Sequence, residues 1–287
     1  MKKTRAPCAD FAASYEFDNV NAPSASAATF YDRVWSDWGH LDERSPAAFH
    51  RRRLLICLIR EYARSSRRIL EVGCGQGNLL RELAREFPAA LVYGADVADE
   101  SLTRAQSHCP RASLFRLDLD SPFFDEHAAD RLGQFDLVIC SEVLEHLHED
   151  RRALIRLAGL LAPNGKVIVS VPGGNPTRFD RAIGHLRHYT EAQLEARLCD
   201  AGFHVERIFA WGFPFHTFYR WVVKWAARVA LHNRDDSRPV TNSAPSPLIS
   251  YGYAAFALAL KPLYYLNRER CGPQLFAVAQ KQGATHG

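Results

Sequence analysis

The chain has 287 residues, enough for one large α/β domain with additions. Its hydrophobic content of 47% and charged content of 24% are ordinary for a globular protein and argue against a disordered chain. The 36 Lys and Arg nearly balance the 32 Asp and Glu, which disfavours nucleic acid as the main partner. Seven scattered Cys without a C-x-x-C pair favour reduced thiols in the cytoplasm over a disulfide framework.

The N-terminal part of the chain predicts an arm followed by a helical cap. Residues 1–28 lack sustained periodicity and carry no apolar segment typical of a secretory signal. Residues 29–66 repeat apolar and aromatic side chains at helical spacing, first from Thr29 and again over about Pro46–Tyr62. The aromatic residues of this cap either pack on the main domain or also cover a bound ligand.

The next stretch, from Arg68 to Leu80, predicts a strand, a tight glycine turn and a helix. Gly73, Gly75 and Gly77 alternate in the turn, where glycine permits unusual backbone angles and lets a ligand approach the main chain. Glu71 lies two residues before the first glycine, and an acid there suits a positively charged ligand better than a diphosphate. We therefore predict a ligand cradle at a helix N-terminus.

Strand and helix patterns then alternate as in a doubly wound α/β sheet. The predicted strands are Ile69–Val72, Leu91–Ala95, Ser113–Leu117, Phe135–Cys140, Lys166–Val171, Gly202–Ala210 and an antiparallel Gln274–Gln280. The predicted helices between them are about Asn78–Phe87, Asp99–Cys109 and Asp150–Leu161. In such folds ligands bind outside the carboxyl ends of the strands.

From Ile69 to Phe209 the ordered motifs resemble the class I S-adenosylmethionine-dependent methyltransferases, whose first motif is the E-x-G-x-G-x-G loop. The resemblance implies a Rossmann-like, mostly parallel seven-stranded sheet with an antiparallel last strand, and S-adenosylmethionine as cofactor. Asp96 matches the acid that binds the ribose hydroxyls, and Asp118 matches the acid that accepts a hydrogen bond from the adenine amino group. The implied cofactor residues are Glu71, Gly73, Cys74, Gly75, Gly77, Asn78, Asp96, Val97, Asp118, Leu119 and Ser141.

The segment after the fourth strand carries Glu142, Glu145 and His146 in an E-x-x-E-H pattern. If this segment is helical, the three side chains share one face. They can be read as acids favoured at a helix N-terminus beside a packed imidazole, as a site in which His146 is catalytic or contacts the acceptor, or as a divalent-metal site. The pattern resembles the ubiquinone-biosynthesis O-methyltransferases and the small-RNA 2′-O-methyltransferases, and the latter complete their metal site with a later histidine.

That later histidine has a candidate in Gly184-His185-Leu186-Arg187-His188-Tyr189-Thr190, which resembles the G-H-x-R-H-Y/F-T segment of many small-molecule and lipid methyltransferases. By position His185 matches the metal histidine of the RNA enzymes, but the aromatic residues that flank their motif are absent, so a metal is not favoured. If the acceptor is a hydroxyl, a base must take its proton, and histidine suits this role. His185 is the first candidate and His188 the second, with Tyr189 as a positioning group, whereas a helix-cap or surface role is the alternative for each histidine.

The predicted cofactor-binding core consists of residues 67–212 and 274–287. Residues 213–273 are predicted to be an insertion into this core. The insertion contains a polar loop from Asn233 to Pro247 between segments that are aromatic, apolar and basic, a composition typical of interfacial helices. It either packs on the sheet, forms a lid over a bulky apolar acceptor, or contacts a membrane or a partner in a homodimer.

The sequence as a whole predicts an enzyme that transfers a methyl group from S-adenosylmethionine to a small-molecule or lipid-like acceptor, at a hydroxyl oxygen. Two alternatives remain open. One is a metal-assisted O-methyltransferase that uses Glu142, Glu145, His146 and His185, and the other is a non-catalytic S-adenosylmethionine-binding partner protein. A nucleic-acid acceptor is not favoured because the chain lacks a concentrated basic stripe. The expected location is the cytoplasm, with peripheral membrane association left open.

Overall fold

The computed structural model describes residue 29, residues 45–125, 127, 130, 132–232, 255–256 and 258–283. The predicted N-terminal arm, nearly all of the first cap helix and the predicted polar loop at 233–247 lie outside the described residues. The second cap helix is confirmed as α2, Pro46–Tyr62. Among the described helices, none combines the length and apolar character that crossing a membrane requires.

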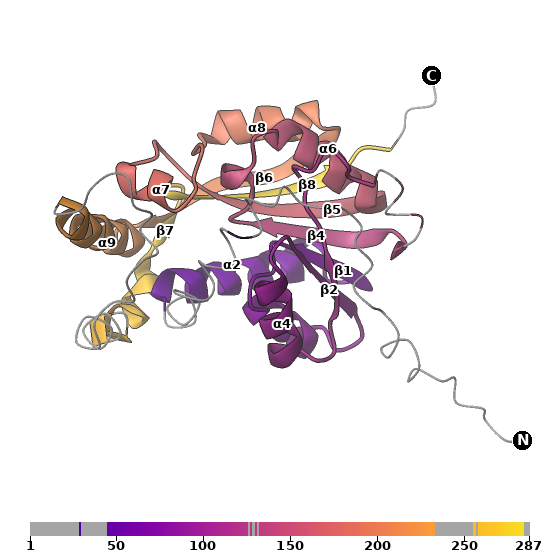
Figure 1. The fold of residues 1–287 in the computed structure, drawn as a ribbon, viewed down its shortest axis with the longest axis horizontal. Helices are drawn as coiled ribbons and strands as arrows, with labels where there is room; N and C mark the ends of the chain where they lie inside the picture. The colour runs from indigo at the N-terminus through magenta and orange to yellow at the C-terminus, as the bar shows by residue number, and fades with distance from the viewer. Residues whose placement is uncertain are drawn as a thin grey trace, which may run out of the picture.

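The centre of the fold is one eight-stranded sheet in the order β3-β2-β1-β4-β5-β8-β6-β7 (Figure 1). Its strands are β1 Arg68–Val72, β2 Leu91–Asp96, β3 Ser113–Arg116, β4 Phe135–Ser141, β5 Leu161–Pro172, β6 Phe203–Phe213, β7 Arg268–Glu269 and β8 Gln274–Lys281. The first five strands pair in parallel, and β8 runs antiparallel to both β5 and β6. The predicted doubly wound architecture with an antiparallel last strand is confirmed.

The predicted count of seven strands was wrong. The eighth strand, β7, has two residues and pairs antiparallel with the end of β6. It forms because β6 continues three residues beyond the predicted end at Ala210, to Phe213, and leaves backbone groups at the sheet edge for the returning insertion to pair with.

Helices cover both faces of the sheet (Figure 1). The helices are α3 Asn78–Glu86, α4 Asp99–His108, α6 Asp150–Leu160, α7 Arg178–Ala182, α8 Glu191–Asp200 and α9 Phe215–His232, with short 3-10 turns η1 Leu144–His146 and η3 Pro262–Leu266. Buried side chains of α6 and α8 pack in one hydrophobic cluster, and those of α2, α3 and α4 pack in another. Each face therefore has its own core.

The alternating direction of strand side chains explains why both faces are apolar. In β1, Ile69 belongs to one cluster, whereas Leu70 and Val72 belong to the other. In β4, Leu137 and Val138 divide in the same way. A strand that is covered on both faces needs apolar residues at nearly every position, which is why these strands are continuous apolar runs in the sequence.

Local signals set where the helices around the site begin. Ser45 caps α2 by accepting a hydrogen bond from the N–H of Ala48, and α8 begins with a capping box between Thr190 and Gln193. The predicted loop from Gly184 to Tyr189, which we call the histidine loop, ends at this cap, because Thr190 directly follows Tyr189.

Candidate active site

The loop after β1 has the backbone conformation that its glycines predict. Gly73, Gly75 and Gly77 have φ angles of 71°, 49° and 79°, in the left-handed region that glycine favours. A Cβ atom added at Gly73 would lie 2.3 Å from Cγ2 of Val143, and one at Gly77 would lie 2.9 Å from Cα of Ala105. The loop therefore packs so closely against its neighbours that side chains are excluded at both positions.

Three predicted carboxylates lie at the carboxyl ends of neighbouring parallel strands. Glu71 lies in β1, Asp96 ends β2 and Asp118 follows β3, and all three are buried. The oxygens of Asp96 accept hydrogen bonds from the N–H of Gly75 at 2.9 Å and of Ala98 at 3.0 Å. Burial raises the pKa of Asp96, while these hydrogen bonds oppose the rise. A carboxylate oxygen has two lone pairs, so Asp96 can also accept hydrogen bonds from ligand hydroxyls.

The other predicted cofactor residues lie at or just after the ends of β1 to β4. They are Cys74, Asn78, Val97, Leu119 and Ser141. The hydroxyl of Ser141 lies 2.7 Å from that of Ser170 in β5. The side chain of Leu119 is buried in the hydrophobic cluster of α6 and α8, and its carbonyl accepts a hydrogen bond from Arg156. The structure thus brings the predicted cofactor residues together at the carboxyl ends of the parallel strands.

The segment after β4 is not the predicted helix. Only η1, Leu144–His146, is helical, as a single 3-10 turn, and Glu142 has a φ of 58°. A residue in the left-handed region cannot belong to a right-handed helix, so Glu142 does not share a helical face with Glu145 and His146. The condition for a shared helical face of Glu142, Glu145 and His146 is therefore not met.

Glu142 has its own set of partners. Its carboxylate accepts hydrogen bonds from Nε2 of Gln274 at 2.6 Å and from the hydroxyl of Ser170 at 3.3 Å. A guanidinium nitrogen of Arg51 lies 3.5 Å from its second oxygen. Glu142 therefore joins α2, β5 and β8 at this edge of the sheet, because Arg51 lies in α2 and Gln274 begins β8.

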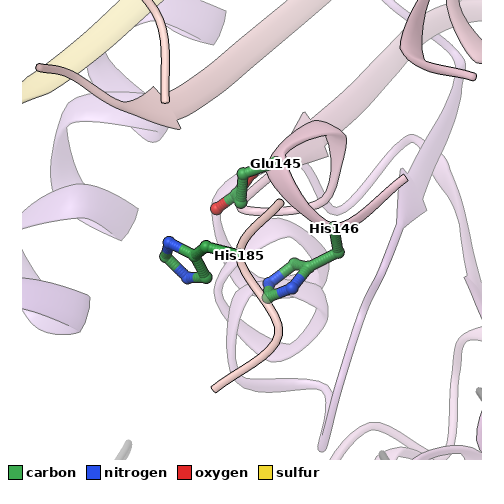
Figure 2. A group of neighbouring side chains, drawn as sticks. All are labelled: Glu145, His146 and His185. Carbon is green, nitrogen blue, oxygen red and sulfur yellow. The ribbon is translucent and has the colours of Figure 1, made fainter. Parts of the chain in front are cut away.

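Glu145, His146 and His185 form a compact group (Figure 2). One oxygen or nitrogen atom from each side chain lies within 4.8 Å of the other two. Nδ1 of His146 lies 3.0 Å from the carbonyl oxygen of Gly184. A carbonyl only accepts, so Nδ1 carries the proton and Nε2 presents a lone pair. Glu145 is fully buried, and neither of its carboxyl oxygens has a hydrogen-bond donor among the described residues.

Burial dominates the electrostatics of this group. It lowers the pKa of His146, and together with the neighbouring His146 and His188 it lowers the pKa of His185 to about 3. Burial also raises the pKa of Glu145 well above its ordinary value, with a further contribution from the negative charge of Glu142. The imidazoles of this group are therefore neutral at pH 7 and keep a nitrogen lone pair, while burial disfavours their protonated forms.

A second group extends from His185 into the fold. Nδ1 of His185 lies 2.9 Å from Nε2 of His188, which lies 3.9 Å from a carboxylate oxygen of Asp180. Nζ of Lys224 and the hydroxyl of Thr177 each donate to Asp180 at 2.7 Å. Burial favours the neutral form of Asp180, but these hydrogen bonds prevail and bring its pKa to about 2. Burial lowers the pKa of His188 to about 4, although the charge of Asp180 opposes the shift.

Tyr189 lies on the far side of the same loop. Its hydroxyl is 3.2 Å from the carbonyl oxygen of Leu144 and 3.0 Å from Oδ2 of Asp150, and the side chain is buried. Burial and the nearby Asp150 raise the pKa of Tyr189. The phenol thus joins the histidine loop to η1 and to the start of α6.

Four residues that no sequence pattern singled out reach this region from α2, the insertion and α7. They are Arg51, Arg220, Lys224 and Asp180. Arg220 and Lys224 are four residues apart in an otherwise aromatic segment, a spacing that places both on one face of a helix. That spacing was a usable signal, whereas nothing in the local sequence distinguishes Arg51 within the run Arg51–Arg53.

Comparison with known proteins agrees with this geometry. The family described as "Methyltransferase domain" matches residues 42–208, which is more than half of the chain. The chain belongs to the class I S-adenosylmethionine-dependent methyltransferases. The resemblance inferred from the glycine loop and the strand-end acids is confirmed.

This methyltransferase is similar to two ubiquinone biosynthesis O-methyltransferases of Escherichia coli. With the protein of strain ATCC 8739 it shares 32% identity over 168 residues, which cover 58% of this chain and 68% of the relative. With that of Escherichia coli O9:H4, strain HS, it shares 34% identity over 122 residues, which cover 42% of this chain and only half of the relative. The N-methyltransferase NodS of Bradyrhizobium japonicum, solved with S-adenosylhomocysteine, has a similar fold, with a TM-score of 0.53, 17% identity, and coverage of 93% of this chain and 100% of NodS.

The residues of this methyltransferase fit S-adenosylmethionine. Gly73, Gly75 and Gly77 are in the left-handed region and have no side chains that would keep a ligand from the main chain of the loop. The polar side chains around these glycines are carboxylates, which suit a cofactor with a sulfonium charge, an ammonium group and ribose hydroxyls. Asp96 has the lone pairs needed for the ribose, and Asp118 lies at the next strand end.

Proposed function

We propose that this enzyme transfers the methyl group of S-adenosylmethionine to a hydroxyl oxygen of a small-molecule or lipid-like acceptor, and that His185 takes the hydroxyl proton. The proposal depends most on the group of neutral imidazoles around His185, next to the cofactor edge of the sheet. The names of the Escherichia coli relatives, which are O-methyltransferases of ubiquinone biosynthesis, support oxygen as the methylated atom and a lipid-like acceptor.

The cofactor supplies an activated methyl group on a sulfonium, so the protein mainly has to orient the acceptor and remove its proton. The pKa of His185, lowered to about 3 mainly by burial, leaves the imidazole unprotonated at pH 7, and the negative charge of Asp180, which raises this pKa, favours uptake of a proton. When Nδ1 of His185 donates to Nε2 of His188, Nε2 of His185 is left as the proton acceptor. After proton transfer the positive charge on the histidine pair is stabilised by Asp180, whose carboxylate lies 3.9 Å from His188.

The test is methyl transfer from tritium-labelled S-adenosylmethionine to catechol, as a soluble phenol, and to a bacterial lipid extract. We expect an ether-linked label with the wild type. We expect at least a hundredfold loss in His185→Gln, because general-base catalysis contributes about 10²–10⁴-fold. His204→Gln is the matched control, because His204 is exposed in β6. Affinity for S-adenosylhomocysteine should be unchanged in both variants.

Two outcomes would contradict the proposal. Label attached to nitrogen or carbon would reject oxygen as the methylated atom. Equal rates for the wild type and His185→Gln, with normal cofactor binding, would reject His185 as the base.

A second candidate function is metal-assisted O-methyl transfer, and one observation favours it. Glu145 is fully buried with both oxygens unpartnered among the described residues. A buried carboxyl without hydrogen bonds is costly unless it is protonated or neutralised by a cation. His146 and His185 lie within 4.8 Å of it, and an imidazole whose Nδ1 donates to a carbonyl, as that of His146 does, is a typical arrangement for a metal ligand. A divalent cation there would polarise the acceptor oxygen.

Glu142, the fourth predicted ligand, is separate from this group, so the metal would be bound by Glu145, His146 and His185. The test is titration of chelator-treated protein with Mg²⁺, Mn²⁺ and Zn²⁺, with binding measured by calorimetry. Binding that is lost in Glu145→Gln but retained in Glu142→Gln would favour metal-assisted transfer over His185 acting as a base. No binding by the wild type would reject this candidate.

A further inference from the structure

The insertion helix α9 has two charged side chains directed inward and three large aromatic side chains exposed on its outer side. Arg220 and Lys224 lie toward Asp180, at 3.6 and 2.7 Å from its carboxylate oxygens. Phe218, Trp221 and Trp225 are 47%, 62% and 59% exposed. A helix at the surface of a protein in water has the opposite arrangement, with the apolar side facing the core.

The three exposed side chains of α9 form a continuous stripe. At 3.6 residues per turn, positions 218, 221 and 225 fall within an arc of about 60° on the helix. The rings of Phe218 and Trp221 are stacked with centroids 6.2 Å apart. On the inner side of the helix, the buried Tyr219 packs against the buried Tyr264 of η3. The outward stripe is therefore not needed for the core of the insertion.

The exposed apolar side chains of the described chain are concentrated in this insertion. Eight of the twelve large ones belong to it, and Figure 1 shows α9 and the segment of η3 at the same end of the molecule. We call the following set the aromatic face: Phe213, Phe218, Trp221, Trp225, Leu258, Leu263, Tyr265 and Leu266. A concentration of this kind marks a surface that contacts an apolar partner.

The charge of the insertion indicates which partner. Residues 213–273 contain eight Lys and Arg and three Asp and Glu, whereas the rest of the chain contains 28 and 29. The net positive charge of the protein thus resides in the insertion, and α9 contains no acidic residue. Trp and Tyr are the residue types that membrane interfaces favour, and basic residues near them are attracted to anionic headgroups.

We propose that the aromatic face binds the surface of an anionic lipid bilayer, with α9 lying in the plane of the interface and its Trp side chains among the headgroups. Basic residues on the segment that follows η3, Arg268 and Arg270, are exposed and contribute attraction to the anionic headgroups. The helix that carries this face also contacts Asp180, beside His185 and His188, so the docked surface lies next to the candidate active site. This proposal does not depend on the methyl acceptor.

The test is flotation of the full chain with vesicles of phosphatidylcholine, with and without one quarter phosphatidylglycerol. We expect binding to the anionic vesicles, with at least tenfold weaker binding to the neutral ones and a similar loss in 0.5 M NaCl, because the electrostatic attraction is screened. Trp221→Ala/Trp225→Ala should lower the affinity for anionic vesicles at least tenfold. Phe123→Ala is the matched control, since Phe123 is 74% exposed in the segment after β3, at the opposite edge of the sheet.

A measurement on the unaltered protein accompanies the variants. Brominated lipids should quench the wild-type tryptophan fluorescence when the aromatic face enters the headgroup region. Absence of quenching and of flotation, or equal binding by the wild type and the double variant, would overturn the proposal. A concentration-dependent dimer that the double variant abolishes, without vesicle binding, would also overturn it by assigning the face to a second copy of the chain.

Discussion

Gly77→Ala tests the packing of the cofactor loop. Gly77 has a φ of 79°, and an added Cβ would lie 2.9 Å from Cα of Ala105, a backbone atom that can move only if α4 moves. Left-handed strain at a non-glycine residue costs about 1–2 kcal/mol. Overpacking against an immobile neighbour costs about 1–3 kcal/mol more. The variant should therefore lose about 2–5 kcal/mol of unfolding free energy in total.

Gly202→Ala is the control that separates the two costs. Gly202 has a φ of 85°, but a Cβ there would meet no atom within 4 Å. This variant has the strain without the contact, so it should lose only about 1–2 kcal/mol. Any change in the entropy of the unfolded chain is common to both variants and cancels. Urea denaturation gives the free energies, and thermal melts should shift by about 2–4 °C per kcal/mol.

Binding of S-adenosylhomocysteine provides the second measurement on the same two proteins. Displacement of the loop in Gly77→Ala should weaken binding at least tenfold, whereas Gly202→Ala should bind as the wild type does. Equal losses of stability in the two variants would refute the packing argument. Unchanged affinity in Gly77→Ala would refute the role of the loop in holding the cofactor.

Two further predictions concern the histidine loop. Tyr189→Phe removes a donor to the buried Asp150 and should cost about 1–3 kcal/mol in urea denaturation; a loss within error of zero would contradict the anchoring role. The pKa of Asp180 is about 2, and its side chain is buried. As an anion, Asp180 therefore contributes about 2 kcal/mol to the free energy of unfolding above pH 4, and this contribution is lost as the pH falls toward 2. Lys224→Met should raise the pKa of Asp180 and reduce that pH dependence of the melting temperature, whereas Lys166→Met, which removes a salt bridge to Glu206, should not.

The cofactor half of the site could be predicted from sequence because its rules are local. An apolar run followed by glycines gives the strand, turn and helix around Gly75. The acids Glu71, Asp96 and Asp118 then follow from the parallel sheet, because carboxyl ends of parallel strands meet at one edge. Their placement depends only on the order of strands, which the alternating pattern predicts correctly.

The part of the candidate site around Glu145, His146 and His185 could not be predicted in the same way. The pattern from Val143 to Leu147 reads as helical, but Glu142 is in the left-handed region and the turn is fixed from a distance by Leu186, whose N–H donates to the carbonyl of Glu145. Lys224 donates to Asp180 across a separation of 44 residues in the sequence, and no short-range pattern encodes such a contact. The strand β7 has only two residues, too few to show an alternating pattern.

The most direct test of the account is calorimetric titration of the wild-type chain with S-adenosylhomocysteine, repeated with Asp96→Ala. We predict one site of micromolar affinity in the wild type and at least tenfold weaker binding in the variant, because Asp96 is the proposed hydrogen-bond acceptor for the ribose and also accepts the hydrogen bond from the N–H of Gly75. Absence of binding by the wild type, or equal binding by the variant, would contradict the assignment of this edge of the sheet as the cofactor site.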